Sequence, residues 1–225
     1  MHKHGMFGKW APLGVSMAVV LALGACASEQ GLPPSTSYSS QTASPETYSY
    51  QIGPGDQLQI FVWRNPEVSQ TIIVRPDGKI TTPLVEDLQA SGKTPNQLAR
   101  DLEKALETYI RQPIVTVIVA GGIGPYSEQI RVVGQVAGSS QAGGRAAGPQ
   151  AQAIAYRQKM TLLDVMIAVG GLNEFAAGNK TKIVRVVDGK QKEYEVRLDD
   201  LLNGDISANV DMLPGDIVII PESWF

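Results

Sequence analysis

The sequence predicts an α+β fold made of two small mixed domains, which follow a signal peptide and a flexible tether. Three observations lead to this prediction. Short strands alternate with single helices, each helix has a recognisable N-terminal cap, and the same Pro-Gly-Asp turn precedes a strand at residues 54–56 and 214–216. Strands and single helices at this density favour two small cores over one large core. The repeated turn is either common turn chemistry or a device that both domains share.

The first 25 residues have the pattern of a secretory signal. Lys3 and Lys9 form a basic head, residues 10–28 carry no charge, and residues 15–23 are almost wholly apolar. This apolar run is short for a membrane-spanning helix, which needs about 20 residues. Its exit, Leu23-Gly24-Ala25-Cys26, resembles the lipobox of bacterial lipoproteins, which implies cleavage after residue 25 and lipid attachment to Cys26. The alternative is an uncleaved anchor helix with an accidental cysteine.

The composition of the expected mature chain excludes several classes of chemistry. Both histidines, His2 and His4, would leave with the signal, and Cys26 is the only cysteine. A chain without histidine or a free thiol cannot build Ser-His or Cys-His catalysis or a Cys/His zinc site. The chain has a net charge of −3 and no basic run, so a nucleic-acid partner is not expected. We therefore expect no catalytic residue, no metal and no cofactor.

Residues 26–47 combine the candidate lipidated cysteine with a Ser-, Thr- and Pro-rich stretch, which predicts a disordered tether. The first domain is expected over residues 48–122. Alternating residues 57–63 predict a strand, and residues 71–75 and 79–82 predict a hairpin about the turn Pro76-Asp77-Gly78. Thr94-Pro95-Asn96-Gln97 is a capping box that opens a helix. The β-branched run 114–120 is expected to be a central strand.

The second domain is expected over residues 128–222. It would contain a strand at 130–136, a mobile insertion at 137–159, and a helix from Thr161 to Val169 that Gly170-Gly171 closes. A hairpin of residues 183–187 and 193–198, a helical turn at 199–204 and a strand at 217–220 would follow.

Two ordered sets of residues resemble a known family. YQIGPGDQLQIFVWRNPEVSQTIIVRPDGKITTPLV, with the later YIRQPIVTVIV, resembles the polysaccharide export domain of Wza-like outer-membrane export proteins. IRVVGQV, MTLLDVMIAVGGLNEFAAGNKTKIVRV and NVDMLPGDIVIIPE resemble the SLBB domain, a soluble-ligand-binding β-grasp fold. The ending VIIPESWF is similar to export proteins that accompany exosortase (PEP-CTERM) systems.

The resemblance implies a non-enzymatic lipoprotein of exopolysaccharide export, anchored in the outer membrane with its folded domains in the periplasm. Its implied partners are further copies of the chain in a ring, an inner-membrane polysaccharide copolymerase (chain-length determinant) and the polysaccharide. The Wza type continues into a C-terminal spanning helix that has no counterpart before Phe225, so a separate outer-membrane barrel is also expected. The alternative is a monomeric periplasmic lipoprotein that binds a saccharide or peptidoglycan.

The acidic candidates have structural explanations as well as functional ones. Asp56 and Asp216 have two possible roles. They either line the lumen through which a polymer passes or, more simply, accept hydrogen bonds from backbone N–H groups of their own turns. Asp164 is expected to cap a helix. Asp199 and Asp200 are adjacent, so their side chains point apart, which argues against a glycosidase pair.

The aromatic and basic candidates are also ambiguous. Trp63 could stack on a sugar ring but is expected in the core, whereas Trp224 and Phe225 form either an interface patch or part of a core. Three basic residues are expected to form a solvated helix face: Lys93, Arg100 and Lys104. No residue can be assigned to ligand binding from the sequence.

Overall fold

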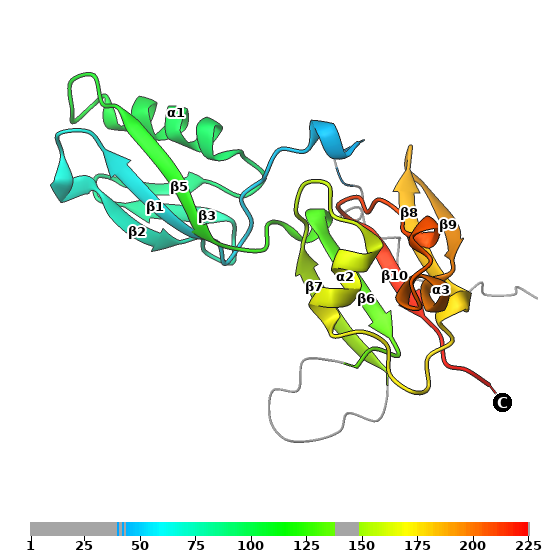
Figure 1. Ribbon diagram of the computed structural model, residues 1–225. Coiled ribbons are helices and arrows are strands. Elements are labelled where there is room, and N and C mark those ends of the chain that lie inside the picture. The colour runs from blue at the N-terminus through cyan, green and yellow to red at the C-terminus, as the bar shows by residue number, and fades with distance from the viewer. Residues whose placement is uncertain (1–39, 41, 43, 138–148, 225) are drawn as a thin grey trace, which may run out of the picture. The chain divides into compact units, whose positions relative to one another are not determined.

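The computed structural model describes residue 40, residue 42 and residues 44–137 and 149–224 (Figure 1). Its helices and strands form two small α+β domains, as the sequence predicts. Cys26 and most of the expected tether lie outside the described residues. The end of that tether is ordered locally, because Pro45–Thr47 form a short 3-10 helix, η2.

The first domain contains a three-stranded antiparallel sheet in the order β2-β1-β5. Strand β1 (Gln57–Val62) lies between β2 (Gln70–Ile73) and β5 (Val115–Gly121). Residues of β1 alternate between exposed and buried, as predicted. The expectation that residues 114–120 form a central strand is wrong, because β5 lies at the edge of this sheet. An apolar run suggests burial on both faces, yet Ile118 remains 47% exposed.

Helix α1 (Pro95–Leu106) packs against β5 and covers one face of the sheet (Figure 1). The predicted capping box is present: Thr94 Oγ1 accepts the Gln97 amide at 3.3 Å, and Gln97 Oε1 accepts the Thr94 amide at 2.8 Å. Leu98, Leu102 and Leu106 recur every four residues and are buried. This apolar stripe joins the buried side chains of β1 in one core.

Strand β3 (Lys79–Thr82) pairs with β4 (Val85–Gln89), so the expected hairpin with residues 71–75 is wrong. The tight turn itself is present, because Gly78 N donates to Arg75 O at 2.8 Å. Beyond this turn the chain diverges, and β2 pairs with β1 instead. The β3–β4 pair contributes to the same core as α1.

The second domain contains a five-stranded sheet in the order β7-β6-β10-β8-β9. Strand β6 (Gln129–Gly134) runs parallel to β10 (Ile217–Ile220), and all other neighbours are antiparallel. Strands β8 (Thr181–Val187) and β9 (Lys190–Val196) form the predicted hairpin. Asp188 and Gly189 both have positive φ at its turn, at 52° and 71°.

Strand β7 (Gln150–Ala155) corrects the expectation of a mobile insertion over residues 137–159. All six residues pair with β6, from Gln150 opposite Gly134 to Ala155 opposite Gln129. The Gly- and Ala-rich composition obscured this strand, because alanine has low strand propensity. Residues 138–148 of the expected insertion lie outside the described residues.

Helix α2 (Leu162–Val169) begins and ends as predicted, and Gly170 and Gly171 both have positive φ at its C-terminus. Together with α3 (Leu198–Leu202), it contributes to the core of the second domain (Figure 1). Four short 3-10 helices connect the elements: η3 (Pro66–Val68), η4 (Tyr126–Glu128), η5 (Gly178–Lys180) and η6 (Ile206–Ala208). No helix within the described residues has the length and apolar character needed to cross a bilayer.

Candidate functional site

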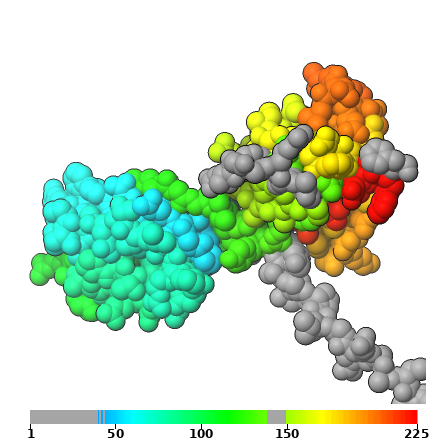
Figure 2. Space-filling view, turned by 90° about the horizontal axis from the view of Figure 1, so that it is seen from below, coloured from blue at the N-terminus to red at the C-terminus, as the bar shows by residue number. Residues whose placement is uncertain are grey.

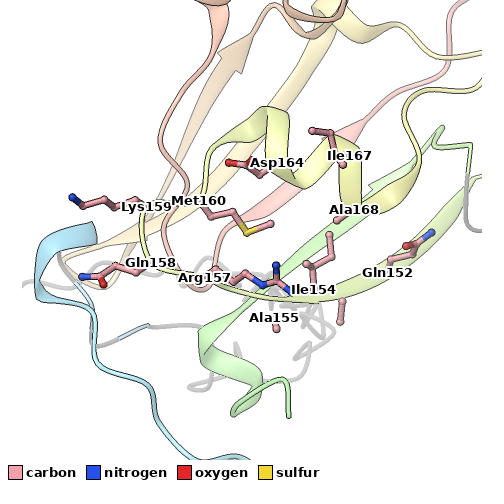
Figure 3. Close-up of a pocket in the computed structure, with 11 residues that line it drawn as sticks. Gln152, Ile154, Ala155, Arg157, Gln158, Lys159, Met160, Asp164, Ile167 and Ala168 are labelled. Carbon is pink, nitrogen blue, oxygen red and sulfur yellow. The ribbon is translucent and has the colours of Figure 1, made fainter. Parts of the chain in front are cut away.

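The second domain has an open cleft between strand β7 and helix α2, with a volume of about 650 Å³ (Figure 3). The loop that joins the two elements, residues 156–160, closes one end. Six of the lining residues define its chemistry: Gln152, Ile154, Arg157, Lys159, Asp164 and Ile167. Strand β7, which forms one wall of this cleft, was not predicted from the sequence.

This cleft offers hydrogen-bond donors and an apolar wall. Arg157 and Lys159 supply cationic donors, and Ile167 on α2 is 71% exposed. In the close-up, the Lys159 side chain points outward from the cleft (Figure 3). Such a surface can bind polar groups next to apolar ones, which is the usual composition of a ligand site.

Asp164, the one carboxylate among the described lining residues, has a structural role. Its Oδ2 accepts the Thr161 amide at 2.9 Å and the Thr161 hydroxyl at 2.7 Å. These bonds hold the pKa of Asp164 below its usual value. An ionised carboxylate committed to a helix cap is a poor general acid. The predicted capping role is therefore confirmed, and this carboxylate is committed to the helix cap.

Asp56 is completely buried beneath its Pro-Gly turn. Its Oδ2 accepts the Gly53 amide at 2.8 Å and the Tyr50 hydroxyl, and its Oδ1 accepts the amides of Ile123 and Gly124 at 3.1 and 3.3 Å. The interpretation of Asp56 as an acceptor within its own turn is thus correct. It also binds the segment that leaves β5.

Asp216 repeats this local geometry in the second domain. Its Oδ2 accepts the Leu213 amide at 2.8 Å, which matches the Gly53–Asp56 bond, and the residue is completely buried. The other donors differ between the two aspartates. Asp216 accepts two hydrogen bonds from Arg185, one at Oδ1 and one at Oδ2, each at 2.7 Å. A bidentate pair of this kind compensates the desolvation of a buried carboxylate. Both turns therefore use an aspartate to anchor a distant segment.

Two tyrosines that precede the first Pro-Gly-Asp turn in the chain have raised pKa values. Burial raises the pKa of Tyr48 to about 12. Burial, followed by the hydrogen bond to Asp56, raises the pKa of Tyr50 as well. Both hydroxyls therefore stay protonated at neutral pH and can donate but not act as bases.

Trp63 is not in the core, which corrects the sequence expectation. It is 54% exposed and makes an edge-to-face contact with Phe61, itself 44% exposed, at a centroid distance of 6.4 Å. Trp63 lies in the turn directly after β1, and its ring contact with Phe61 places both side chains on the same side of the sheet. That face is opposite the one covered by α1, since Val62, between them, is buried.

The C-terminal Trp224 is 87% exposed, so it does not belong to a core. The last described residues, coloured red, lie at the surface (Figure 2). Ser223 N donates to Phe175 O at 2.8 Å, which ties the segment to the second domain. The interface patch stays a prediction for Trp224, and Phe225 lies outside the described residues.

The basic residues on and before α1 take part in local ion pairs. Lys93 pairs with Asp101, and Arg100 pairs with Glu103 at 2.7 Å while also donating to Val115 O at 3.3 Å. Lys104 is exposed on the same helix. This is a solvated helix face, as expected, and Arg100 also forms a hydrogen bond to β5.

Asp199 and Asp200 do not form a catalytic pair. Asp199 accepts the Asn179 amide at 2.9 Å, whereas Asp200 accepts the Asn179 side chain at 2.8 Å and an ion pair from Arg197. Both carboxylates thus hold α3 to η5. No group of three or more potential metal ligands occurs within residues 44–137 and 149–224.

Two contributions to these sites were missed from the sequence. Arg185 lies 31 positions from Asp216, and no spacing rule links residues so far apart. Strand β7 had a usable signal, because Gln150, Gln152 and Ile154 alternate with alanines over six residues. Cys26, the predicted lipid attachment site, lies outside the described residues and stays a prediction.

Comparison with known proteins identifies both domains. Residues 44–120 match the family model described as "Polysaccharide biosynthesis/export protein", and residues 139–220 match the model of the SLBB domain. The chain is similar to "EPS I polysaccharide export outer membrane protein EpsA" of Ralstonia nicotianae, with 26% identity over 197 residues. Its similarity to the protein of the same name from Ralstonia solanacearum is 28% over 193 residues.

These alignments cover 77% and 75% of this chain but 47% of each relative, so the chain spans about half the length of the curated relatives it matches. The matched families are export proteins and not enzymes. The similarity to exosortase-associated proteins stays a prediction. The chain carries a polysaccharide export domain followed by an SLBB domain, which is the domain content of a Wza-like polysaccharide export protein.

Proposed function

We propose that this protein is a periplasmic, outer-membrane-attached component of an exopolysaccharide export system. The observation that carries the proposal is the order of its two domains, a polysaccharide export domain and then an SLBB domain. The two relatives are named polysaccharide export outer membrane proteins, which supports the same role. In this role the protein passes polymer across the envelope and makes or breaks no bond.

The proposal includes specific partners. Further copies of the chain would form a ring around the polymer, and an inner-membrane polysaccharide copolymerase would deliver the polymer to it. Lipid on Cys26 would attach the chain to the outer membrane, where two or more acyl chains anchor a protein stably.

The cleft beside α2 favours a second candidate, a monomeric lipoprotein that binds a saccharide or peptidoglycan fragment. Arg157 would hold acidic or hydroxyl groups of such a ligand. Export requires weak contacts, because a polymer must slide, whereas a sensor requires saturable binding. Isothermal titration of the full chain with short oligosaccharides separates the two.

The direct test of the export proposal is deletion of the gene. Cells without the protein should lose polysaccharide from their surface and medium while lipid-linked precursors are still made. Sedimentation of the full chain in detergent, alone and with the copolymerase, tests the ring. A species that stays monomeric in both conditions, together with tight oligosaccharide binding, would favour the sensor.

A further inference from the structure

The three-stranded sheet of the first domain has one open face. α1 and the β3–β4 pair pack on the opposite face, where Leu58, Ile60 and Val62 are buried. The open face carries large side chains that stay accessible: Phe61, Trp63, Ile73 and Ile118 are 44%, 54%, 64% and 47% exposed. Burial of apolar surface is the main driving force of folding, so this much exposure on one face marks an interaction surface.

Strand register places polar groups among these apolar ones. Gln59 on β1 lies opposite Thr71 on β2 and opposite Ile118 on β5, and Phe61 lies opposite Thr116. Directly opposed residues share a face, so amides and hydroxyls alternate with the apolar side chains across the sheet. Gln57, opposite Ile73, continues the pattern toward the other end of β1.

The aromatic end of this surface lies where β1 ends. Phe61 and Trp63 meet edge to face at 6.4 Å, so each ring retains an accessible surface. From Gln57 to Trp63 the face extends over about 20 Å, at roughly 3.3 Å per residue. It is therefore a long strip and not an enclosed pocket.

The three strands of this face carry no charged side chain. Strands β1, β2 and β5 contain no Asp, Glu, Lys, Arg or His, although 18% of the whole chain is charged. A partner that contacts these strands must therefore supply hydroxyl groups and C–H surface, not ionic groups. Amide and hydroxyl side chains can exchange hydrogen bonds with sugar hydroxyls, and aromatic rings can cover the C–H face of a pyranose ring.

We propose that the open face of this sheet is a sliding contact for uncharged stretches of the polysaccharide, with Phe61, Trp63, Gln59 and Gln57 as its main contacts. The inference rests on the proposed export function and names the surface on which the polymer moves. An open, neutral strip suits this task, because each sugar can exchange contacts with the next amide without breaking an ion pair. The cationic cleft of the second domain has different chemistry and is not part of this strip.

The test compares two exposed tryptophans. The full chain, kept in a zwitterionic detergent, is run on native gels. One gel contains dextran, which is a neutral glucan, and the other contains dextran sulfate, its anionic counterpart. Wild-type protein should be retarded by dextran. Trp63→Ala should weaken the apparent affinity about tenfold, a loss typical of a large aromatic contact. Trp224→Ala removes an equally large, more exposed side chain and should leave the retardation unchanged.

Gln59→Ala provides a second variant with little risk to folding, because Gln59 is exposed. It should also reduce retardation by dextran. Equal retardation of Trp63→Ala, Gln59→Ala and wild type by dextran would overturn the inference. A change of sedimentation coefficient in Trp63→Ala without loss of dextran binding would assign the face to contacts between copies instead.

The failure of this inference can be told apart from failure of the export proposal. If Trp63→Ala and Gln59→Ala bind and export like wild type while the deletion strain does not export, only the polymer surface is wrong. If the deletion strain exports normally, the proposed function is wrong.

Discussion

Arg185 and Asp216 form a two-pronged ion pair that joins β8 to the turn before β10, with both N···O distances at 2.7 Å. Asp216 is completely buried and the Arg185 side chain is 23% exposed. Burial of this kind makes the pair costly to break, because removing the cation leaves a carboxylate that water cannot reach. The hydrogen bond to Asp216 also raises the pKa of Arg185, so the cation stays charged at any accessible pH.

Arg185→Leu should therefore destabilise the second domain by about 3 kcal/mol, the usual cost of breaking a buried pair. Urea unfolding of the full chain, with hydrogen exchange to locate the change, measures this loss. Arg197→Leu is the matched control. Arg197 pairs with Asp200 and Asp205 but is 56% exposed, so its loss should cost less than about 1 kcal/mol. Equal effects of the two substitutions would contradict the assigned importance of the buried pair.

Gly122→Ala should destabilise the first domain because Asp56 leaves no room for a methyl group. A Cβ at Gly122 would lie 2.1 Å from Asp56 Oδ1. The Asp56 carboxylate is fixed by its hydrogen bonds, so the expected cost is about 1–3 kcal/mol. Gly121→Ala is the control, since a Cβ there meets nothing within 4 Å. If the melting temperature falls equally in both variants, Asp56 does not hold the segment that follows β5.

The two tyrosines predict a loss of stability at alkaline pH. An unperturbed tyrosine ionises near pH 10, whereas Tyr48 in the folded protein ionises near 12 and the pKa of Tyr50 is also raised. Above pH 10 the unfolded chain therefore releases protons that the folded chain retains, and the free energy of unfolding falls as pH rises. Tyr50→Phe should flatten this fall between pH 10 and 12, as urea titrations at successive pH values would reveal. An unchanged slope would exclude Tyr50 as a source.

Cys26→Ser tests the predicted lipid anchor. Without a thiol at this position no lipid can be attached, so the protein should move from the membrane fraction to the periplasmic fraction after gentle cell lysis. Metabolic labelling with a radioactive fatty acid should mark the wild type and not the variant. A variant that stays in the membrane fraction would favour the uncleaved anchor helix.

Local chemistry made much of the fold predictable. The Thr94 capping box, the Gly170-Gly171 helix end and the Pro-Gly-Asp turns are short-range devices, and each is present in the structure. The wrong predictions concern pairing and coverage, which depend on distant residues. Alternation correctly separates the two faces of β1, but it cannot show that Trp63 stays exposed among the residues that the structure describes. For the same reason, the acceptor role of Asp216 followed from its turn whereas its partner Arg185 did not.

The measurement that tests the export proposal most directly is a pulse–chase experiment on newly made polysaccharide. Cells are given a radioactive sugar briefly, and the label in polymer is followed from the cell to the surface and medium. In the deletion strain, labelled material should remain in the cell as precursor or short polymer, and a plasmid copy of the gene should restore its release. Release at the wild-type rate from the deletion strain would contradict a role for this protein in export.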